Sequence, residues 1–277
     1  MIDANQIRIL AAQTKIDPGM VEKDYVLSKA LMALAQDDFF QNIFLFKGGT
    51  ALKKCFYPNW RFSEDLGFTS KERLESKDIK SIFQKTVDKA GRLFGLSMKV
   101  IEYSQYPKSD SRPISAQLKL GYDGPLRKSS GQKNNIRVDI ALEEVIVSSP
   151  DTKKIFKIYT DDIDAQLPTY PFEEIVAEKL RSILQRGKSR DYYDVWILLK
   201  DYDKDFSFDK MWSIFKKKCQ YKKIPVPEVD DFFLPQRTEE AGRYWERGLA
   251  HQVANLADYR LTLNELKELL TKSLVEK

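Results

Sequence analysis

A pair of glycines between an apolar run and a helical pattern constrains the fold of this chain most. Residues 43–46 are apolar and predict a short buried strand, and Gly48-Gly49-Thr50 follows it and begins a helix expected to end near residue 56. Two adjacent glycines let the backbone approach a bound group closely and reach positive φ. A helix that begins at such a corner directs free N–H groups toward it, and this arrangement suits a phosphate. The stretch therefore predicts a phosphate-binding corner.

A second strand is expected at residues 64–68, with Asp65 inside a hydrophobic run. A carboxylate at the end of a buried strand costs free energy unless it binds a cation or a hydrogen-bond donor. A Gly-Gly turn or an acidic strand end is common in α/β proteins, where each usually has a structural role. The combination of strand, corner, helix and acidic strand is more specific, and it predicts a site for a metal-bound nucleoside triphosphate.

Several sequence blocks follow one another in the order of a known family. They are residues 21–25 (VEKDY), 46–52 (FKGGTAL), 61–67 (RFSEDLG), 177–180 (AEKL) and 190–194 (RDYYD). They resemble the motifs of the AbiEii/AbiGii-type toxin nucleotidyltransferases, which belong to the DNA polymerase β-like superfamily and are related to MenT-type toxins. The resemblance covers roughly residues 18–200. The sequence departs from the family pattern R-F-S-x-D-h-D, in which h is apolar, at Gly67, which replaces the second carboxylate.

The resemblance implies an α+β (mixed α/β) fold, in which a polymerase β-like nucleotidyltransferase sheet domain precedes a mainly helical C-terminal domain. The periodicity agrees, because alternating strand patterns prevail before about residue 160 and helical patterns after it. We therefore expect a nucleotidyltransferase α/β domain with N-terminal helices at residues 1–165 and a helical domain at residues 166–277.

The resemblance also implies the residues of the site. The nucleotide would be bound by Lys47, Gly48, Gly49, Thr50, Ser63 and Lys179. The catalytic residues would be Asp65, Asp139, Lys179 and Asp191. Asp65 and Asp139 would hold Mg²⁺ or Mn²⁺, with Gly67 at the position of a missing ligand. Lys179 would neutralise phosphate charge, and Asp191 would orient Lys179 or the acceptor.

Each of these residues outside the corner has a simpler structural explanation. Asp139 is the lone acid of an alternating strand at residues 136–142, expected next to the preceding acidic strand, and it could be an exposed residue of a half-solvated sheet. Lys179 lies on or beside the apolar face of a helix, where a lysine usually snorkels. Asp191 falls in the first turn of a helix, where an acid stabilises the helix dipole without further function.

Charged residues elsewhere also leave two explanations open. Lys23 and Asp24 are either a solvated pair on an N-terminal helix or, as the resemblance implies, residues that position the nucleotide site. Two basic clusters could contact nucleic-acid phosphates, or they could be solvated surface. Their members are Arg127, Lys128 and Lys133 in a loop, and Lys216, Lys217, Lys218, Lys222 and Lys223 around Tyr221.

The composition is that of a folded protein with a mild positive charge. The 46 basic and 41 acidic residues give +5, which is compatible with an RNA or nucleotide substrate. Cys55 and Cys219 lack metal-ligand spacing and are expected to be free thiols. His251 is the single histidine, which excludes a histidine-rich metal site and disfavours Ser-His-Asp catalysis. No apolar run reaches the length of a membrane span and the start does not resemble a signal peptide, so we expect a cytoplasmic protein without a membrane partner.

The resemblance implies a nucleotidyltransferase toxin of a bacterial toxin–antitoxin system of the abortive-infection type. Family members block translation, and several add nucleotides to the 3′ end of tRNA. Transfer of NMP from an NTP requires in-line attack on the α-phosphorus with release of pyrophosphate. The partners would be an NTP, tRNA or another RNA, and a cognate antitoxin. Two alternatives stay open: a catalytically silent protein that binds a nucleotide, RNA or a protein, which Gly67 favours, and an enzyme that nucleotidylates protein.

Overall fold

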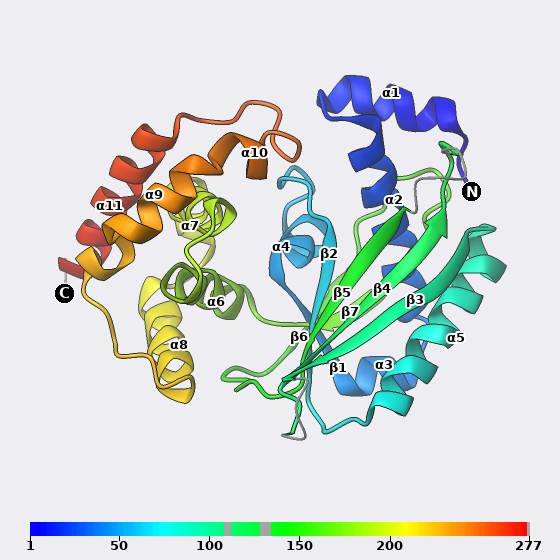
Figure 1. Cartoon of the computed structure of the whole chain (residues 1–277), viewed down its shortest axis with the longest axis horizontal. Coiled ribbons are helices and arrows are strands. Elements are labelled where there is room, and N and C mark those ends of the chain that lie inside the picture. Colours follow the sequence, from blue (N-terminus) through cyan, green and yellow to red (C-terminus); the bar gives the residue numbers. More distant parts are fainter. Residues whose placement is uncertain (108–111, 128–133, 276–277) are drawn as a thin grey trace. The chain divides into compact units, whose positions relative to one another are not determined.

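Strands prevail in the first part of the chain and helices in the second, as the periodicity predicted (Figure 1). The structure is a computed structural model that describes residues 1–107, 112–127 and 134–275. It divides into two units. The first comprises Met1–Glu144 and Pro150–Thr169, and the second comprises Val145–Ser149 and Tyr170–Lys277. The predicted mixed α/β fold, a sheet followed by helices, is confirmed.

In the first unit, seven strands among the described residues form one mixed sheet in the order β3-β4-β5-β2-β1-β7-β6. The strands are β1 (Phe44–Lys47), β2 (Asp65–Ser70), β3 (Ser97–Tyr106), β4 (Ser115–Asp123), β5 (Asn135–Ala141), β6 (Asp151–Lys154) and β7 (Gln166–Thr169). β2 pairs with β1 antiparallel and with β5 parallel. The strand that begins at Asp65 therefore lies at the centre of the sheet, next to the strand that carries Asp139.

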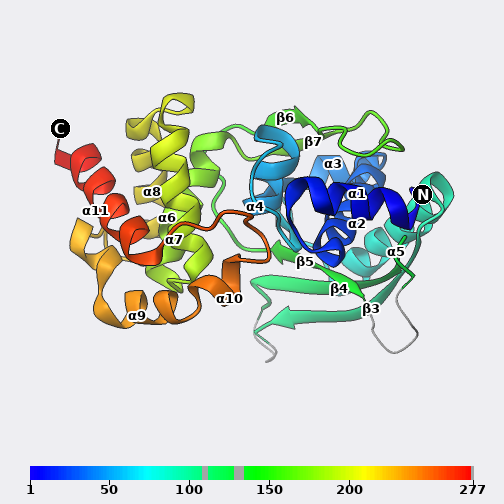
Figure 2. The same cartoon turned by 90° about the horizontal axis from the view of Figure 1, so that it is seen from above.

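Helices of the first unit cover one face of this sheet. They are α1 (Ala4–Thr14), α2 (Pro18–Leu34), α3 (Asp38–Ile43), α4 (Gly48–Ala51), the π-helix η1 (Leu52–Phe56) and α5 (Ser76–Phe94). Figure 2 shows α2 and α5 on the same side of β3, β4 and β5. The alternation expected for β5 is confirmed, because Ile136, Val138 and Ile140 are buried while Arg137 and Asp139 are partly exposed. This alternation places the polar side chains of β5 on the face opposite the apolar core.

The second unit is helical. Its helices are α6 (Phe172–Gln185), α7 (Ser189–Asp201), η2 (Asp203–Asp205), α8 (Phe208–Tyr221), η3 (Val229–Phe233), α9 (Pro235–Arg243), α10 (Trp245–Leu249) and α11 (Tyr259–Val275). The segment Val145–Ser149 joins it through buried charges. The carboxylate of Glu174 accepts hydrogen bonds from the backbone N–H groups of Val147 and Ser148 at 3.0 and 2.9 Å, and Lys218 Nζ donates to the carbonyl of Val145 at 2.9 Å.

The helix expected to begin at the Gly-Gly corner and to end near residue 56 is confirmed, because α4 continues directly into the π-helix η1, which ends at Phe56. Glu75 caps α5 in a reciprocal arrangement with Asp78. The helical path is interrupted at Tyr244, between α9 and α10, and the chain turns back after α10 so that the buried Trp245 ring donates from Nε1 to the carbonyl of Ala257 at 2.9 Å.

Candidate active site

The Gly-Gly corner joins β1 to α4 and is bonded directly to the acidic strand. Gly48 has φ +88°, in the left-handed region that favours glycine, and a Cβ there would meet no atom within 4 Å. The requirement for glycine at this position is therefore conformational rather than steric. The Thr50 hydroxyl donates to the carbonyl oxygen of Asp65, so the corner and the start of β2 are held together.

Asp65 and Asp139 share one face of the sheet. In the parallel register of β2 and β5, Asp65 is opposite Arg137 and Gly67 is opposite Asp139. Residues two apart in a strand point to the same face, so both carboxylates face the side on which Gly67 lacks a side chain. The structure thus brings together the two predicted acids and the position of the third.

Arg137 lies between these two acids and binds both. Its Nη2 is 2.9 Å from Asp65 Oδ2, and its Nε is 3.2 Å from Asp139 Oδ2. Gln117 Nε2 donates to Asp139 Oδ1 at 2.7 Å. Partial burial opposes the charge of Arg137, but the attraction of Asp139 and the hydrogen bond and attraction of Asp65 outweigh it and raise the pKa of the guanidinium. Arg137 is therefore charged at every accessible pH.

The two predicted metal ligands, Asp65 and Asp139, are paired with a guanidinium in this structure. Among the described residues, no group of three or more His, Cys, Asp and Glu side chains is arranged to hold a metal ion. Carboxylate oxygens are suitable ligands for Mg²⁺, which prefers several of them or water. Here the two carboxylates that could serve are already bound to a cation, Arg137. The alternation in residues 136–142 puts Arg137 on the same face as Asp139, but nothing in the sequence patterns indicated its pairing with Asp65.

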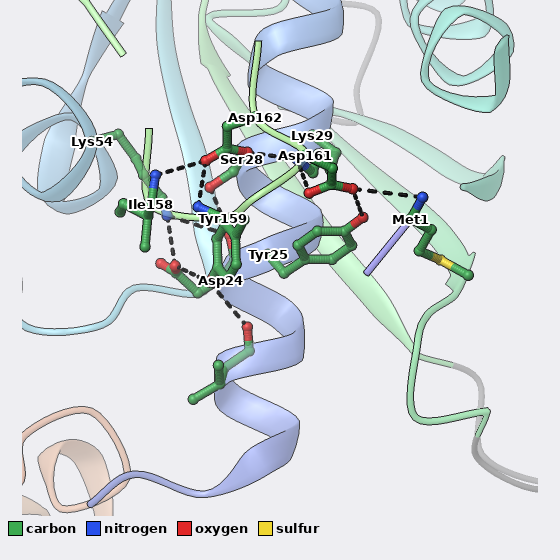
Figure 3. Close-up of polar contacts among 11 residues, drawn as sticks. Met1, Asp24, Tyr25, Ser28, Lys29, Lys54, Ile158, Tyr159, Asp161 and Asp162 are labelled. Atoms are coloured by element: carbon green, nitrogen blue, oxygen red, sulfur yellow. Dashed lines mark hydrogen bonds and ion pairs between the residues drawn. The ribbon is translucent and has the colours of Figure 1, made fainter. Parts of the chain in front are cut away.

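A buried network lies behind the corner and includes the acid of the VEKDY block. Lys54 Nζ in η1 is 2.6 Å from Asp24 Oδ2, and the Tyr159 hydroxyl donates to the same oxygen at 2.7 Å (Figure 3). Burial opposes ionisation of Asp24, but the attraction of Lys54 and Lys53 and the hydrogen bonds from Lys54 and Tyr159 outweigh it, so its pKa is lowered. Asp24 is only 1% exposed, and its alternative as a solvated surface acid is wrong.

The same network fixes the segment that carries Tyr159. Lys29 Nζ is 2.6 Å from both Asp161 Oδ1 and Asp162 Oδ1. Asp162 Oδ2 accepts the backbone N–H groups of Ile158 and Tyr159, each at 2.8 Å. The segment is therefore anchored to α2, and α2 in turn is anchored to the helix that follows the corner (Figure 3).

Lys53 holds the segment that leads into β2. Its Nζ donates to the carbonyl oxygens of Trp60 at 2.9 Å and Pro58 at 3.3 Å, and it lies 4.1 Å from the centroid of the Phe62 ring. Desolvation lowers the pKa of Lys53 to about 8, despite the opposing attraction of Asp24. Ser63, a predicted nucleotide-binding residue, lies at the end of this segment, with its Oγ 3.5 Å from Asp65 Oδ1.

In the second unit, the predicted lysine is paired with a different aspartate from the one expected. Lys179 Nζ in α6 is 2.6 Å from Oδ2 of Asp194 in α7, and Asp194 is fully buried. Asp191, which was expected to orient Lys179 or the acceptor, instead accepts from Arg186 Nε and Nη2 at 2.9 and 2.8 Å, and from the N–H of Lys188 at 3.1 Å. Asp194 therefore orients Lys179, because one turn of α7 places it toward α6.

The two basic clusters have different outcomes. Lys128 and Lys133 lie outside the described residues. The prediction that Lys218 belongs to a nucleic-acid surface is wrong, because this lysine is fully buried. Its Nζ lies 2.9 Å from Glu174 Oε1 and 3.1 Å from Glu178 Oε1. The remaining lysines of that cluster are exposed or half-buried. Both cysteines are buried free thiols, as expected.

Comparison with known proteins identifies the class and the family. The family model described as "Nucleotidyl transferase AbiEii toxin, Type IV TA system" matches residues 29–272. The protein is thus a nucleotidyltransferase. The chain belongs to the AbiEii toxin family of type IV toxin–antitoxin systems, and the predicted resemblance is confirmed. Membership implies a nucleotide substrate and an antitoxin partner.

A solved structure shares the fold. MenT4, a nucleotidyltransferase toxin from Mycobacterium tuberculosis H37Rv, is similar with a TM-score of 0.67 at 18% identity, over 98% of this chain and 90% of that chain. No curated protein matches the sequence. Within the part of the chain that the structure describes, no helix combines the length and apolar character that crossing a membrane requires.

Proposed function

We propose that the protein transfers NMP from an NTP to RNA, with the 3′ end of tRNA as acceptor, and thereby blocks translation in the cytoplasm until an antitoxin neutralises it. The observation that carries the proposal is the hydrogen bond from Thr50, in the Gly-Gly corner, to the carbonyl of Asp65 at the start of the acidic strand. The side chains of Asp65 and Asp139 face the same side of the sheet next to this corner. Family membership supports the reaction, and the name of MenT4 as a nucleotidyltransferase toxin agrees with it.

The corner would bind the triphosphate through Lys47, Gly48, Gly49 and Thr50, with Ser63 beside it. Backbone N–H groups and cations stabilise the charge that develops on phosphate oxygens during transfer. Lys179 would contribute one such cation, held ready by Asp194. Nucleotidyltransferases generally use a divalent metal ion, and here Mg²⁺ or Mn²⁺ would arrive on the nucleotide, since Asp65 and Asp139 are both already paired with Arg137.

Gly67 favours one alternative, a weakened or silent site. A transferase that has lost a carboxylate from its acidic strand keeps the corner and so keeps the means to bind nucleotide. We propose that transfer by this chain is slow rather than absent, because Asp65 and Asp139 remain on one face.

The test is incubation of the purified protein with each of the four labelled NTPs and total RNA, with Asp65→Asn as the inactive control. Label at the 3′ end of tRNA from one NTP, lost in Asp65→Asn, is the expected result. Label in protein instead of RNA would show that the acceptor is a protein. Label in neither RNA nor protein, even with the Gly67→Asp variant, would support a silent nucleotide-binding protein. Because Asp65 is partly exposed, the control should remain folded, which circular dichroism would verify.

A further inference from the structure

We propose that Arg137 is an internal cation of this site, which takes the place of a protein-bound divalent ion in the nucleotide-free protein and keeps its affinity for free metal low. The proposal concerns the same site as the proposed function, but it does not require that any transfer takes place. It rests on the placement of one guanidinium between two carboxylates.

The register makes this placement a property of the sheet. Arg137 is opposite Asp65 in the adjacent strand and two residues before Asp139 in its own strand, so all three side chains share one face. The guanidinium donates to Asp65 from Nη2 and to Asp139 from Nε, at 2.9 and 3.2 Å. Using two different nitrogens of its planar group, Arg137 bridges the two acids that were predicted to hold a divalent ion.

Charge and partial burial explain why Arg137 stays between Asp65 and Asp139. The side chains of Asp65, Arg137 and Asp139 are 21%, 40% and 43% exposed, so their mutual attraction is only partly screened. Gly67 is opposite Asp139 and supplies no third acid. Two carboxylates and one guanidinium leave a net charge of −1, which attracts a divalent cation much less than the −2 that the carboxylates would have alone.

Lys119 provides a matched control. It is opposite Arg137 in the register of β4 and β5, on the same face, and its side chain is 38% exposed. It differs in its partner, because its Nζ is 2.7 Å from Glu102 in β3. Lys119→Gln therefore removes one positive charge from the same face without releasing Asp65 or Asp139.

The experiment measures Mn²⁺ binding to the nucleotide-free full chain by electron paramagnetic resonance of free Mn²⁺, for the unaltered protein, Arg137→Gln, Arg137→Lys and Lys119→Gln. We expect Arg137→Gln to bind Mn²⁺ roughly tenfold or more tightly than the unaltered protein, because a positive charge in contact with both ligands has been removed. Lys119→Gln should change the affinity by less than about threefold, since its charge is further away and screened. Arg137→Lys should bind Mn²⁺ weakly, like the unaltered protein.

A fourth variant separates specific from general effects. Arg137→Gln combined with Asp65→Asn should lose the gained affinity. Equal Mn²⁺ affinity in the unaltered protein and Arg137→Gln would overturn the proposal, and so would an equal gain in Lys119→Gln. If Arg137→Gln does not fold, Arg137→Lys is compared with Arg137→Lys/Asp65→Asn instead. Tight Mn²⁺ binding by Arg137→Lys that is lost in the double variant would then overturn the proposal. No transfer assay is involved, so this result is distinguishable from failure of the proposed reaction.

Discussion

Adding a carboxylate at residue 67 is the sharpest test of how the proposed site works. Gly67→Asp adds a third acid on the face that carries Asp65 and Asp139. A Cβ at residue 67 would lie 3.1 Å from the carbonyl oxygen of Lys47 in β1, a tight contact that a shift of a few tenths of an ångström would relieve. The change is therefore sterically possible, and its effect is mainly electrostatic.

The expected changes in the free energy of unfolding follow from the residues next to Gly67, which are Lys47 in β1 and Asp139 in β5. Replacing a strand glycine by alanine is favourable by roughly 0.5–1 kcal/mol, which the contact with Lys47 would offset, so Gly67→Ala should leave the free energy of unfolding nearly unchanged. Gly67→Asp adds a like charge opposite Asp139 and should be about 1 kcal/mol less stable than Gly67→Ala. Excess Mn²⁺ at 100 times its Kd would return about 2.7 kcal/mol to a variant that binds it. Only Gly67→Asp should gain stability in this way.

The assay compares the unaltered protein, Gly67→Ala and Gly67→Asp for label transfer to tRNA and for urea unfolding with and without Mn²⁺. We expect Gly67→Asp to raise the transfer rate by roughly 10²-fold, the order by which one charge contact in a transition state changes kcat. Gly67→Ala should not raise it. The reasoning is refuted if the unaltered protein already transfers nucleotides at a rate that Gly67→Asp does not improve.

Three further predictions concern buried charges. Asp24→Asn should lower the free energy of unfolding by about 3–5 kcal/mol at pH 7, because Lys54 is left buried without its counter-charge. This difference between the two proteins should shrink as the pH falls toward 4 and below, since an acid with a lowered folded pKa contributes stability that is lost on protonation. An unchanged difference at low pH in urea titrations would contradict this. Lys53 has a folded pKa of about 8, below its unfolded value, so the free energy of unfolding should rise between about pH 8 and 10.4 as the folded protein releases this proton first. Lys53→Met should lack this rise, and the difference between the two pH profiles of stability measures it. Lys179→Gln should weaken ATP binding at least about tenfold, and Asp194→Asn, which keeps the lysine charge but removes the carboxylate that orients it, should weaken binding by less; equal losses in calorimetry and in melting temperature for both variants would show that the pair is structural only.

Period-two and helical patterns predicted the elements that carry the site. The alternation in residues 136–142 placed Asp139 on the polar face of β5, and the strand lies next to β2 as expected. The same alternation places Arg137 on that face, but its contact with Asp65 depends on the register between the two strands. A shift of register changes every cross-strand pair without changing the alternation, so the sequence pattern could not reveal this contact.

Contacts between distant segments were also beyond local patterns. Asp24 binds Lys54, 30 residues away, and Tyr159, 135 residues away. A charged pair on a helix normally faces solvent, and only tertiary packing buries it. The exchange of Asp191 for Asp194 as the partner of Lys179 has a similar cause, because the contact is set by how α7 packs on α6 and not by position in the first turn.

The segment Val145–Ser149 has a practical consequence for dividing this protein. Because it belongs with the helices while Pro150–Thr169 belongs with the sheet, the polypeptide passes from one unit to the other after residues 144, 149 and 169. A helical fragment that begins at residue 170 would lack the backbone N–H groups that satisfy Glu174 and the carbonyl that binds Lys218. Its buried charges would then lose hydrogen bonds, which is costly in a dry interior. Split-protein designs and complementation libraries should therefore fail at residue 170, and a circular permutant that keeps all three crossings intact is the better way to open the chain.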